Sequence, residues 1–158
     1  MSASRLWPAT HLRSIEDFVS GVSHTPTMYR REVGVCQIAT FDFDINQAAG
    51  TYDICTATDN PILVNGVVVM ALDDHSGKGT YTGISVQSDY TTNQVIISQG
   101  NGVAANLTSY SQLAWDGEIY LGTGKKLQYT VYGGAIGSAS LMTSIVRYRA
   151  VLDGGYLA

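Results

Sequence analysis

The chain has 158 residues, of which 45% are hydrophobic and only 14% are charged, and its formal net charge is −4. This length suits one domain, and the apolar content excludes an intrinsically disordered chain. The negative charge argues against a nucleic-acid-binding protein, which needs an excess of Lys and Arg to neutralise phosphates. An average soluble domain carries about 25% charged residues, so this composition favours a structural or assembly protein whose surface is partly covered by other molecules.

The first 34 residues differ from the rest in charge and pattern. They hold four basic and three acidic residues, whereas residues 35–158 hold five basic and ten acidic ones. They show no strand-like alternation, and their one helical signal is short, over residues 14–22. Their apolar side chains are too many for a solvated tail and too few for a core. The sequence therefore predicts that residues 1–34 form an extended N-terminal arm, with at most one short helix, that docks on a neighbouring subunit.

From residue 35 onward the pattern is all-β. Eight segments have the β-branched and aromatic content of strands and are separated by turn residues. They span residues 35–43, 51–57, 61–72, 80–88, 94–99, 117–122, 125–133 and 140–152. Alternation is clearest near the C-terminus, where Leu127, Tyr129 and Val131 share one face of a strand. Eight strands with connections of mixed length predict a jelly-roll-like β-sandwich domain over residues 35–158, with a different β-sandwich as the main alternative.

Neither a signal peptide nor a membrane span is indicated by the hydropathy pattern. The most apolar segment, residues 61–72, is interrupted by Asn65-Gly66, and a membrane-spanning helix needs about 20 residues. We therefore expect a soluble protein that is made in a cytoplasm and does not bind membranes. Cys36 and Cys55 both fall on expected strands, and we expect two reduced thiols that face the core, with a disulfide as the alternative.

The sequence contains no convergent set of reactive groups. Asp42 and Asp44 point to the same side of an expected strand, and residues 73–75 (Asp-Asp-His) form a second polar cluster. Neither completes a calcium-binding loop, which needs six or more oxygen ligands, so we expect solvated carboxylates and a surface histidine. Asp116 and Glu118 flank Gly117, but this spacing alone is weak evidence for a carboxylate pair. We therefore expect no enzymatic activity, no metal and no cofactor.

Five segments of the expected sandwich form a pattern. They are AAGTYDICTAT (48–58), PILVNGVVVMA (61–71), TGISVQSDYTTNQVIIS (82–98), GVAANLTSYSQLAWDGEIYLGTGKKLQYTVYGGAIGSA (102–139) and SIVRYRAVLDGGYLA (144–158). Together these segments resemble a group of small virion proteins of tailed bacteriophages. The resemblance covers roughly residues 40–158, without a catalytic signature, and residues 1–34 lie outside it.

This resemblance implies a head decoration (cement) protein. Such a protein would be a jelly roll that sits as a homotrimer on the outer surface of the capsid and contacts the major capsid protein, without nucleic-acid or membrane partners. A protein that binds only the assembled shell stabilises that shell. The candidate contact residues of the arm are Trp7, Phe18 and Tyr29 as apolar anchors, and Arg30 and Arg31 as charged groups. The three aromatic residues could instead pack on their own domain.

Two other functions fit parts of the same sequence. A receptor- or glycan-binding head-fibre or tail-tip module would use exposed aromatic rings to stack on sugars. The candidate rings are Tyr52, Tyr81, Tyr90, Tyr110, Trp115, Tyr120 and Tyr132. A shell-forming coat protein is the third candidate, but the nearly balanced charge of the arm argues against one that packages RNA. A glycan binder should bind cells as an isolated domain, whereas a cement protein should bind only the assembled shell.

Overall fold

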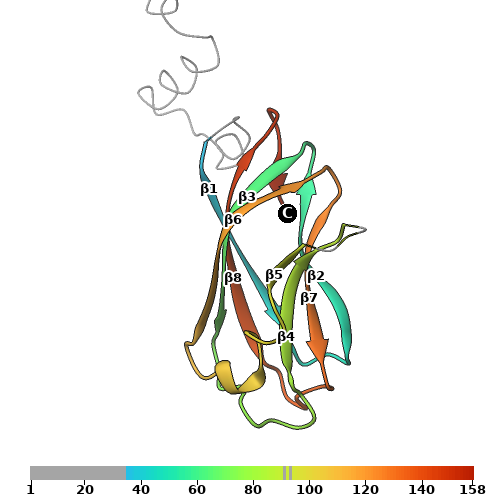
Figure 1. The fold of residues 1–158 in the computed structure, drawn as a ribbon, viewed down its shortest axis with the longest axis vertical. Helices are drawn as coiled ribbons and strands as arrows, with labels where there is room; N and C mark the ends of the chain where they lie inside the picture. Colours follow the sequence, from blue (N-terminus) through green and yellow to red (C-terminus); the bar gives the residue numbers. More distant parts are fainter. Residues whose placement is uncertain (1–34, 91, 93) are drawn as a thin grey trace, which may run out of the picture.

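Nine strands form two antiparallel sheets in the computed structural model, which describes residues 35–158 apart from residues 91 and 93 (Figure 1). The four-stranded sheet has the order β1 (Gln37–Asp44), β8 (Leu141–Ala150), β3 (Ile62–Ala71) and β6 (Gln112–Leu121). The five-stranded sheet has the order β5 (Val95–Ile97), β4 (Gly83–Ser88), β7 (Lys126–Tyr132), β2 (Gly50–Thr58) and β9 (Tyr156–Leu157). A single 3-10 turn, η2 (Ala104–Asn106), precedes β6 in this part of the chain.

The strand pairs are those of a jelly roll. Strand β1 pairs with β8, β2 with β7, β3 with β6 and β4 with β5, all antiparallel. These four pairs describe one long hairpin that is rolled up, so that successive strands mostly fall in opposite sheets. The predicted fold class, an all-β jelly-roll-like sandwich, is confirmed.

Two parts of the strand pattern were not predicted. Strand β6 begins at Gln112, five residues before the expected segment 117–122. Residues 112–116 contain no β-branched residue and end in Asp116, so their propensity for a strand is weak; pairing with β3 orders them. The short β9 adds to the edge of β2, with Ala57 opposite Leu157.

The interruption at Asn65-Gly66 is a β-bulge in β3. Between Val64 and Gly66, β3 has one residue more than β8, while β6 has one residue more than β3. The extra residue restores the alternation on the far side of the bulge, so that Val64 and Val67 both face the core. A polar pair inside an apolar strand is thus explained by its backbone geometry.

The core lies between the two sheets and is built by alternate residues of their strands. Leu127, Tyr129 and Val131 of β7 are all buried, which confirms the predicted inward face. Opposite them, β8 contributes Met142 and Val146, both fully buried. Burying a side chain of this size contributes about 1.5–3 kcal/mol. One hydrophobic cluster reaches from Ala39 to Leu157 and includes residues of both sheets.

The described residues, 35–158 without 91 and 93, contain no helix long and apolar enough to cross a bilayer.

Candidate interaction surfaces

The candidate contact residues of the arm lie outside the part of the chain that the structure describes. These residues are Trp7, Phe18, Tyr29, Arg30 and Arg31, and the short helix expected over residues 14–22 lies there as well. The arm and its contacts therefore stay predictions. The surfaces of the sandwich that could receive such contacts are described below.

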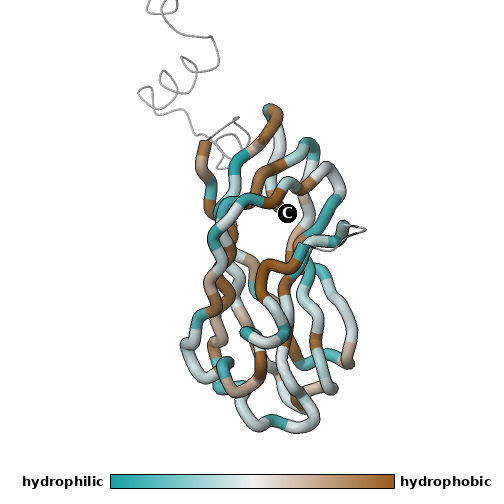
Figure 2. The backbone as a smooth tube through the Cα atoms, viewed as in Figure 1, coloured by the Kyte–Doolittle hydropathy of each residue, from teal (hydrophilic) through white to brown (hydrophobic). Residues whose placement is uncertain are grey.

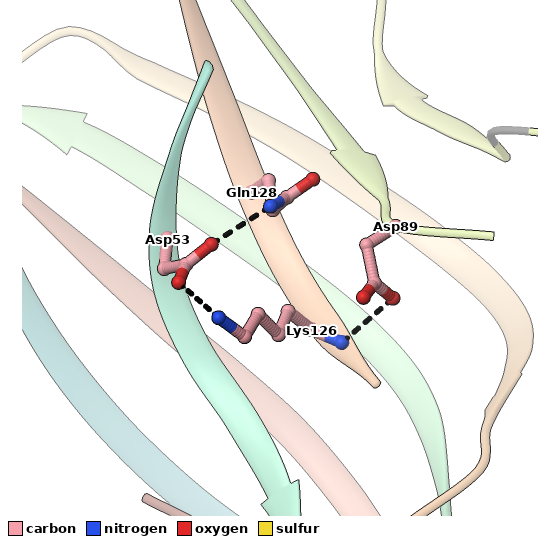
Figure 3. A network of polar contacts seen from close by, with 4 residues as sticks. All are labelled: Asp53, Asp89, Lys126 and Gln128. Atoms are coloured by element: carbon pink, nitrogen blue, oxygen red, sulfur yellow. Dashed lines mark hydrogen bonds and ion pairs between the residues drawn. The ribbon is translucent and has the colours of Figure 1, made fainter. Parts of the chain in front are cut away.

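The outer face of the five-stranded sheet is polar and its side chains bind one another. In Figure 3 the carboxylate of Asp53 on β2 accepts hydrogen bonds from Nζ of Lys126 and from Nε2 of Gln128 (2.7 Å), both on β7. Oδ1 of Asp89 accepts the backbone N–H of Lys126 at 2.8 Å. The hydrogen bond from Gln128, followed by that from Lys126, lowers the pKa of Asp53. This carboxylate therefore stays ionised well into the acidic range.

Hydroxyl pairs continue the polar ladder across the same sheet. The side-chain oxygens of Thr51 and Thr130 are 2.9 Å apart, and those of Ser85 and Tyr132 are 3.0 Å apart. Cross-strand pairs of this kind stabilise a sheet by a few tenths of a kcal/mol to about 1 kcal/mol each. Because its polar groups bind one another, this face offers little apolar surface to a partner.

The outer face of the four-stranded sheet is different, and we call it the mixed face. One row across it consists of Thr40, Ile145, Val68 and Ala114, which lie opposite one another on β1, β8, β3 and β6. Ala114 is exposed, while Ile145 and Val68 are half-buried. An apolar row therefore crosses three of the four strands, β8, β3 and β6, and is partly open to solvent.

Next to that row, two arginines of β8 are neutralised by two carboxylates of β6. Arg147 pairs with Asp116, and Nη2 of Arg149 lies 2.9 Å from Oε1 of Glu118. Gly66 has no Cβ, and this leaves room for the guanidinium of Arg147 against β3. Exposed ion pairs contribute little stability. In these two pairs, however, a carboxylate on β6 balances the charge of each arginine. Asp116 and Glu118 are thus ion-pair partners and not a reactive carboxylate pair.

Exposed apolar side chains are concentrated on the strands of the four-stranded sheet and their extensions. In Figure 2 the chain at the start of β1 and the loop after β8 are brown, the colour of hydrophobic residues. Among the described residues eight large hydrophobic side chains are exposed, and Val95 and Tyr110 are the two that lie elsewhere. The other six belong to β1, β6 or β8, or directly precede β1 or follow β8: Val35, Ile38, Tyr120, Leu141, Val151 and Leu152. Contiguous exposed apolar surface is typical of an interaction site.

The acidic pair on β1 is engaged in local hydrogen bonds. Asp42 accepts the hydroxyl of Thr143 at 2.6 Å. Oδ1 of Asp44 accepts the backbone N–H groups of Asn46 and Ser140, at 2.8 and 2.9 Å. The carboxylate of Asp44 therefore ties the end of β1 to the start of β8. Over residues 35–158, with 91 and 93 left out, no group of three or more His, Cys, Asp or Glu side chains is placed to hold a metal.

His75 is buried, and the expectation of a surface histidine was wrong. Its ring has no exposed surface, and neither ring nitrogen makes a hydrogen bond of ordinary geometry with a described residue. The backbone N–H of His75 donates to the carbonyl of Leu107 at 2.8 Å, which fixes the turn against the chain before β6. Burial, followed by the charge of Lys78, lowers the pKa of His75.

Of the two cysteines, only Cys55 faces the core as expected. Burial raises the pKa of the Cys55 thiol to about 12. Cys36 is exposed, so its predicted core position was wrong. It lies one residue before β1, at the edge of the sheet, where the alternation of a strand no longer determines burial. The two thiols are free and form no disulfide with each other.

Most of the aromatic rings considered for sugar stacking have structural roles. The ring of Tyr81 is buried, the hydroxyl of Tyr90 accepts the N–H of Gly122 at 2.7 Å, and the ring of Trp115 lies against Gly117. Tyr52 packs against the core, and Tyr132 is half-buried and bonded to Ser85. The two rings with large exposed area are Tyr110 (72%) and Tyr120 (49%).

A groove of about 220 Å³ lies between β5 and β6 at the open side of the sandwich. It is lined by aliphatic residues such as Ile97 and by amides, among them Asn101 and Asn106, but none of its lining residues is aromatic. The amide of Asn106 donates to the carbonyl of Asn101 at 2.9 Å. The groove thus lacks the stacking ring that sugar binding prefers.

No protein-family model matches the chain, and no curated protein matches it. Among solved structures, a chain in the acidic stable capsid structure of Helicobacter pylori bacteriophage KHP30 is similar, with 14% identity and a TM-score of 0.50. That match covers 81% of this chain and 96% of the other. A chain in the capsid asymmetric unit of cyanophage Pam1 is similar with 12% identity and a TM-score of 0.54, over 82% and 95% of the two chains.

At these identities the likeness establishes a common fold. Each match spans nearly the whole of the other chain, so the sandwich described here accounts for almost all of both phage chains. Both of these structural neighbours are chains from bacteriophage capsids.

Proposed function

We propose that this protein is a structural component of a bacteriophage virion, and specifically a decoration protein that binds the outer surface of the assembled head and stabilises it. The observation that carries this proposal is the jelly roll itself, which matches chains from two phage capsids over almost their full length. The resemblance of residues 40–158 to decoration proteins supports the same assignment.

The physical basis of the stabilisation is linkage. A protein that binds the assembled shell but not its separated subunits shifts the equilibrium toward assembly. Closed rotational symmetry is the common way to repeat one contact between identical chains, and linked contacts gain avidity. We therefore propose a homotrimer whose partners are the major capsid protein and its own copies.

Residues 1–34 would supply part of the contacts. Trp7, Phe18 and Tyr29 are rings of the type that dominates binding energy at interfaces. Arg30 and Arg31 would approach acidic surface, since arginine forms bidentate pairs with carboxylates. In this proposal the sandwich is the rigid body and the N-terminal segment is the connector.

The test is to titrate the purified full-length protein onto phage heads assembled without it, and to measure bound copies per head. We expect saturation at a whole-number multiple of the symmetry-equivalent capsid sites, and an increase in the temperature at which the heads rupture. Unassembled capsid protein is the control and should bind little. Absence of binding to heads, combined with binding to host cells or glycans, would replace this proposal with the receptor-binding function.

The distribution of exposed rings favours decoration over glycan binding. Tyr110 precedes β6 and Tyr120 lies near its end, and ten residues of extended chain span about 30 Å. One sugar unit cannot stack on both rings at that separation. A glycan site would therefore have to form around a single tyrosine.

A further inference from the structure

We propose that the mixed face of the four-stranded sheet is the surface on which residues 1–34 of a second copy of the protein bind. This inference rests on the proposed function, because it assigns the receiving surface for the contacts between copies. It is carried by the distribution of exposed apolar groups, by the place where residues 1–34 join the sheet, and by charge.

The apolar groups gather at one end of the mixed face. Gln37 lies opposite Tyr148, so the chain around Val35 runs beside the end of β8, where Val151 and Leu152 are exposed. Ile38 on β1 is 61% exposed at the same end. Among the described residues the five-stranded sheet exposes one large apolar side chain, Val95 on its edge strand β5. An apolar partner would therefore bury more apolar surface on the mixed face than on the outer face of the five-stranded sheet.

Residues 1–34 join the domain at this end of the sheet. They precede Val35, and their apolar side chains include Trp7 and Phe18. The hydrophobic cluster among the described residues runs from Ala39 to Leu157 and lies between the two sheets. In this proposal the apolar side chains of residues 1–34 are buried on the outer surface of another copy.

Length and direction favour a second copy as the acceptor. Thirty-four residues reach about 110 Å when extended, whereas the eight residues of β1 span about 27 Å. Strand β1 begins at one end of the sheet. A segment that extended the line of β1 toward the N-terminus would therefore run beyond that end and away from the sheet. A segment of this reach is long enough to cross to a neighbouring copy.

Charge is complementary as well. Residues 1–34 hold four basic and three acidic residues, and residues 35–158 hold five basic and ten acidic ones. On the mixed face, Arg147 and Arg149 are neutralised within the sheet, while Asp42 has no ion-pair partner among the described residues. Asp42 is the acidic group available to Arg30 or Arg31 of another copy.

Cys36 provides a direct test in the full-length chain. A photoreactive maleimide should label Cys36 selectively, because Cys55 is buried and the pKa of its thiol is about 12. Unlabelled and nitrogen-15-labelled chains are mixed in denaturant, refolded together, irradiated and analysed by mass spectrometry. We expect cross-links from Cys36 to the tryptic peptides 6–13 and 14–30 in which one partner is heavy and the other light. Cross-links confined to one isotope, or none to these peptides, would overturn the inference.

A matched pair of substitutions tests the surface itself. Ile38 (61% exposed, β1) and Val95 (56% exposed, β5) are aliphatic residues on edge strands of different sheets. Ile38→Asp should weaken self-association about tenfold or more and lower the mass measured by light scattering, since one lost apolar anchor costs at least a factor of this size. Val95→Asp should leave the mass unchanged. Equal behaviour of the two variants contradicts the assignment of the mixed face.

The outcome separates this inference from the proposed function. A chain that binds heads but gives no mixed-isotope cross-link overturns the inference and leaves the decoration function in place. A chain that exchanges residues 1–34 between copies but binds no head overturns the function and leaves the inference.

Discussion

At the residue scale, the imidazole of His75 couples stability to pH. Its pKa is lowered by burial and by Lys78, and these effects are opposed by Asp73, by the backbone of Leu141 and by Asp74. In the unfolded chain an ordinary histidine titrates near 6.5. Between the folded and unfolded pKa values the unfolded chain binds more protons. The stabilising effect of the neutral ring is therefore fully present above pH 6.5 and is lost as the pH falls toward the folded pKa.

We expect the free energy of unfolding to decrease as the pH falls below 6.5, with a slope of at most about 1.4 kcal/mol per pH unit from this group. His75→Leu keeps an apolar side chain in the site and should reduce the slope. Urea denaturation of both proteins at several pH values measures it. His11 and His24 remain in both chains and serve as an internal control. Identical slopes in the two proteins would show that His75 does not carry the effect.

At the scale of elements, the connection between β7 and β8 depends on a glycine at a close backbone contact. Gly133 follows β7 with φ +88, and a Cβ at this position would overlap the carbonyl oxygen of Thr80 in the chain leading to β4. Gly137 has nearly the same φ, +91, but a Cβ there would meet nothing within 4 Å. An alanine at Gly137 therefore tests backbone strain alone, whereas an alanine at Gly133 tests the same strain together with a steric overlap.

Gly137→Ala should cost about 1–2 kcal/mol of stability, the usual cost of a left-handed conformation for an L-residue. Gly133→Ala adds steric overlap with a backbone atom, which cannot move as a side chain does, and we expect about 3 kcal/mol or more in total. Chemical denaturation of the two variants gives both numbers. Equal costs would mean that the chain at Thr80 relaxes without loss of stability.

At the scale of the whole molecule, the two sheets enclose one hydrophobic core, to which strands from both ends of the described chain contribute. Its members reach from Phe43 on β1 and Cys55 on β2 to Leu157 on β9. The jelly roll pairs β1, the first described strand and an edge strand of its sheet, with β8, which lies near the other end of the chain. The domain is therefore closed by contacts between distant parts of the described chain.

Deletion of residues 1–34 should leave a folded sandwich that binds heads at least about tenfold more weakly, because the apolar anchors are lost while the core stays intact. Circular dichroism and a cooperative thermal transition report the fold, and the head-binding titration reports the function. The full-length chain with Trp7→Ala and Phe18→Ala is the companion variant and should show part of the same loss. An unfolded truncated domain would mean that residues 1–34 belong to the core.

Alternation in the sequence determined the strands and the inward faces of the sandwich. Leu127, Tyr129 and Val131 could be assigned to the core from their spacing, because a strand directs every second side chain to one face. Turn residues indicated the connections between most strands, whereas the ion-pair partners of Asp116 and Glu118 were not predicted from the sequence. These inferences rely only on neighbours along the chain.

The tertiary structure alone decided what depends on residues far apart in sequence. His75 lies in a polar segment, yet its turn is bonded to Leu107 and the ring is covered. The first half of β6 and all of β9 are ordered by their pairing partners β3 and β2, not by their own propensity. The contrast between the polar and the mixed face likewise follows from strand order, because that order decides which outward side chains meet. Periodicity specifies the direction of a side chain, and only the packed structure specifies what it contacts.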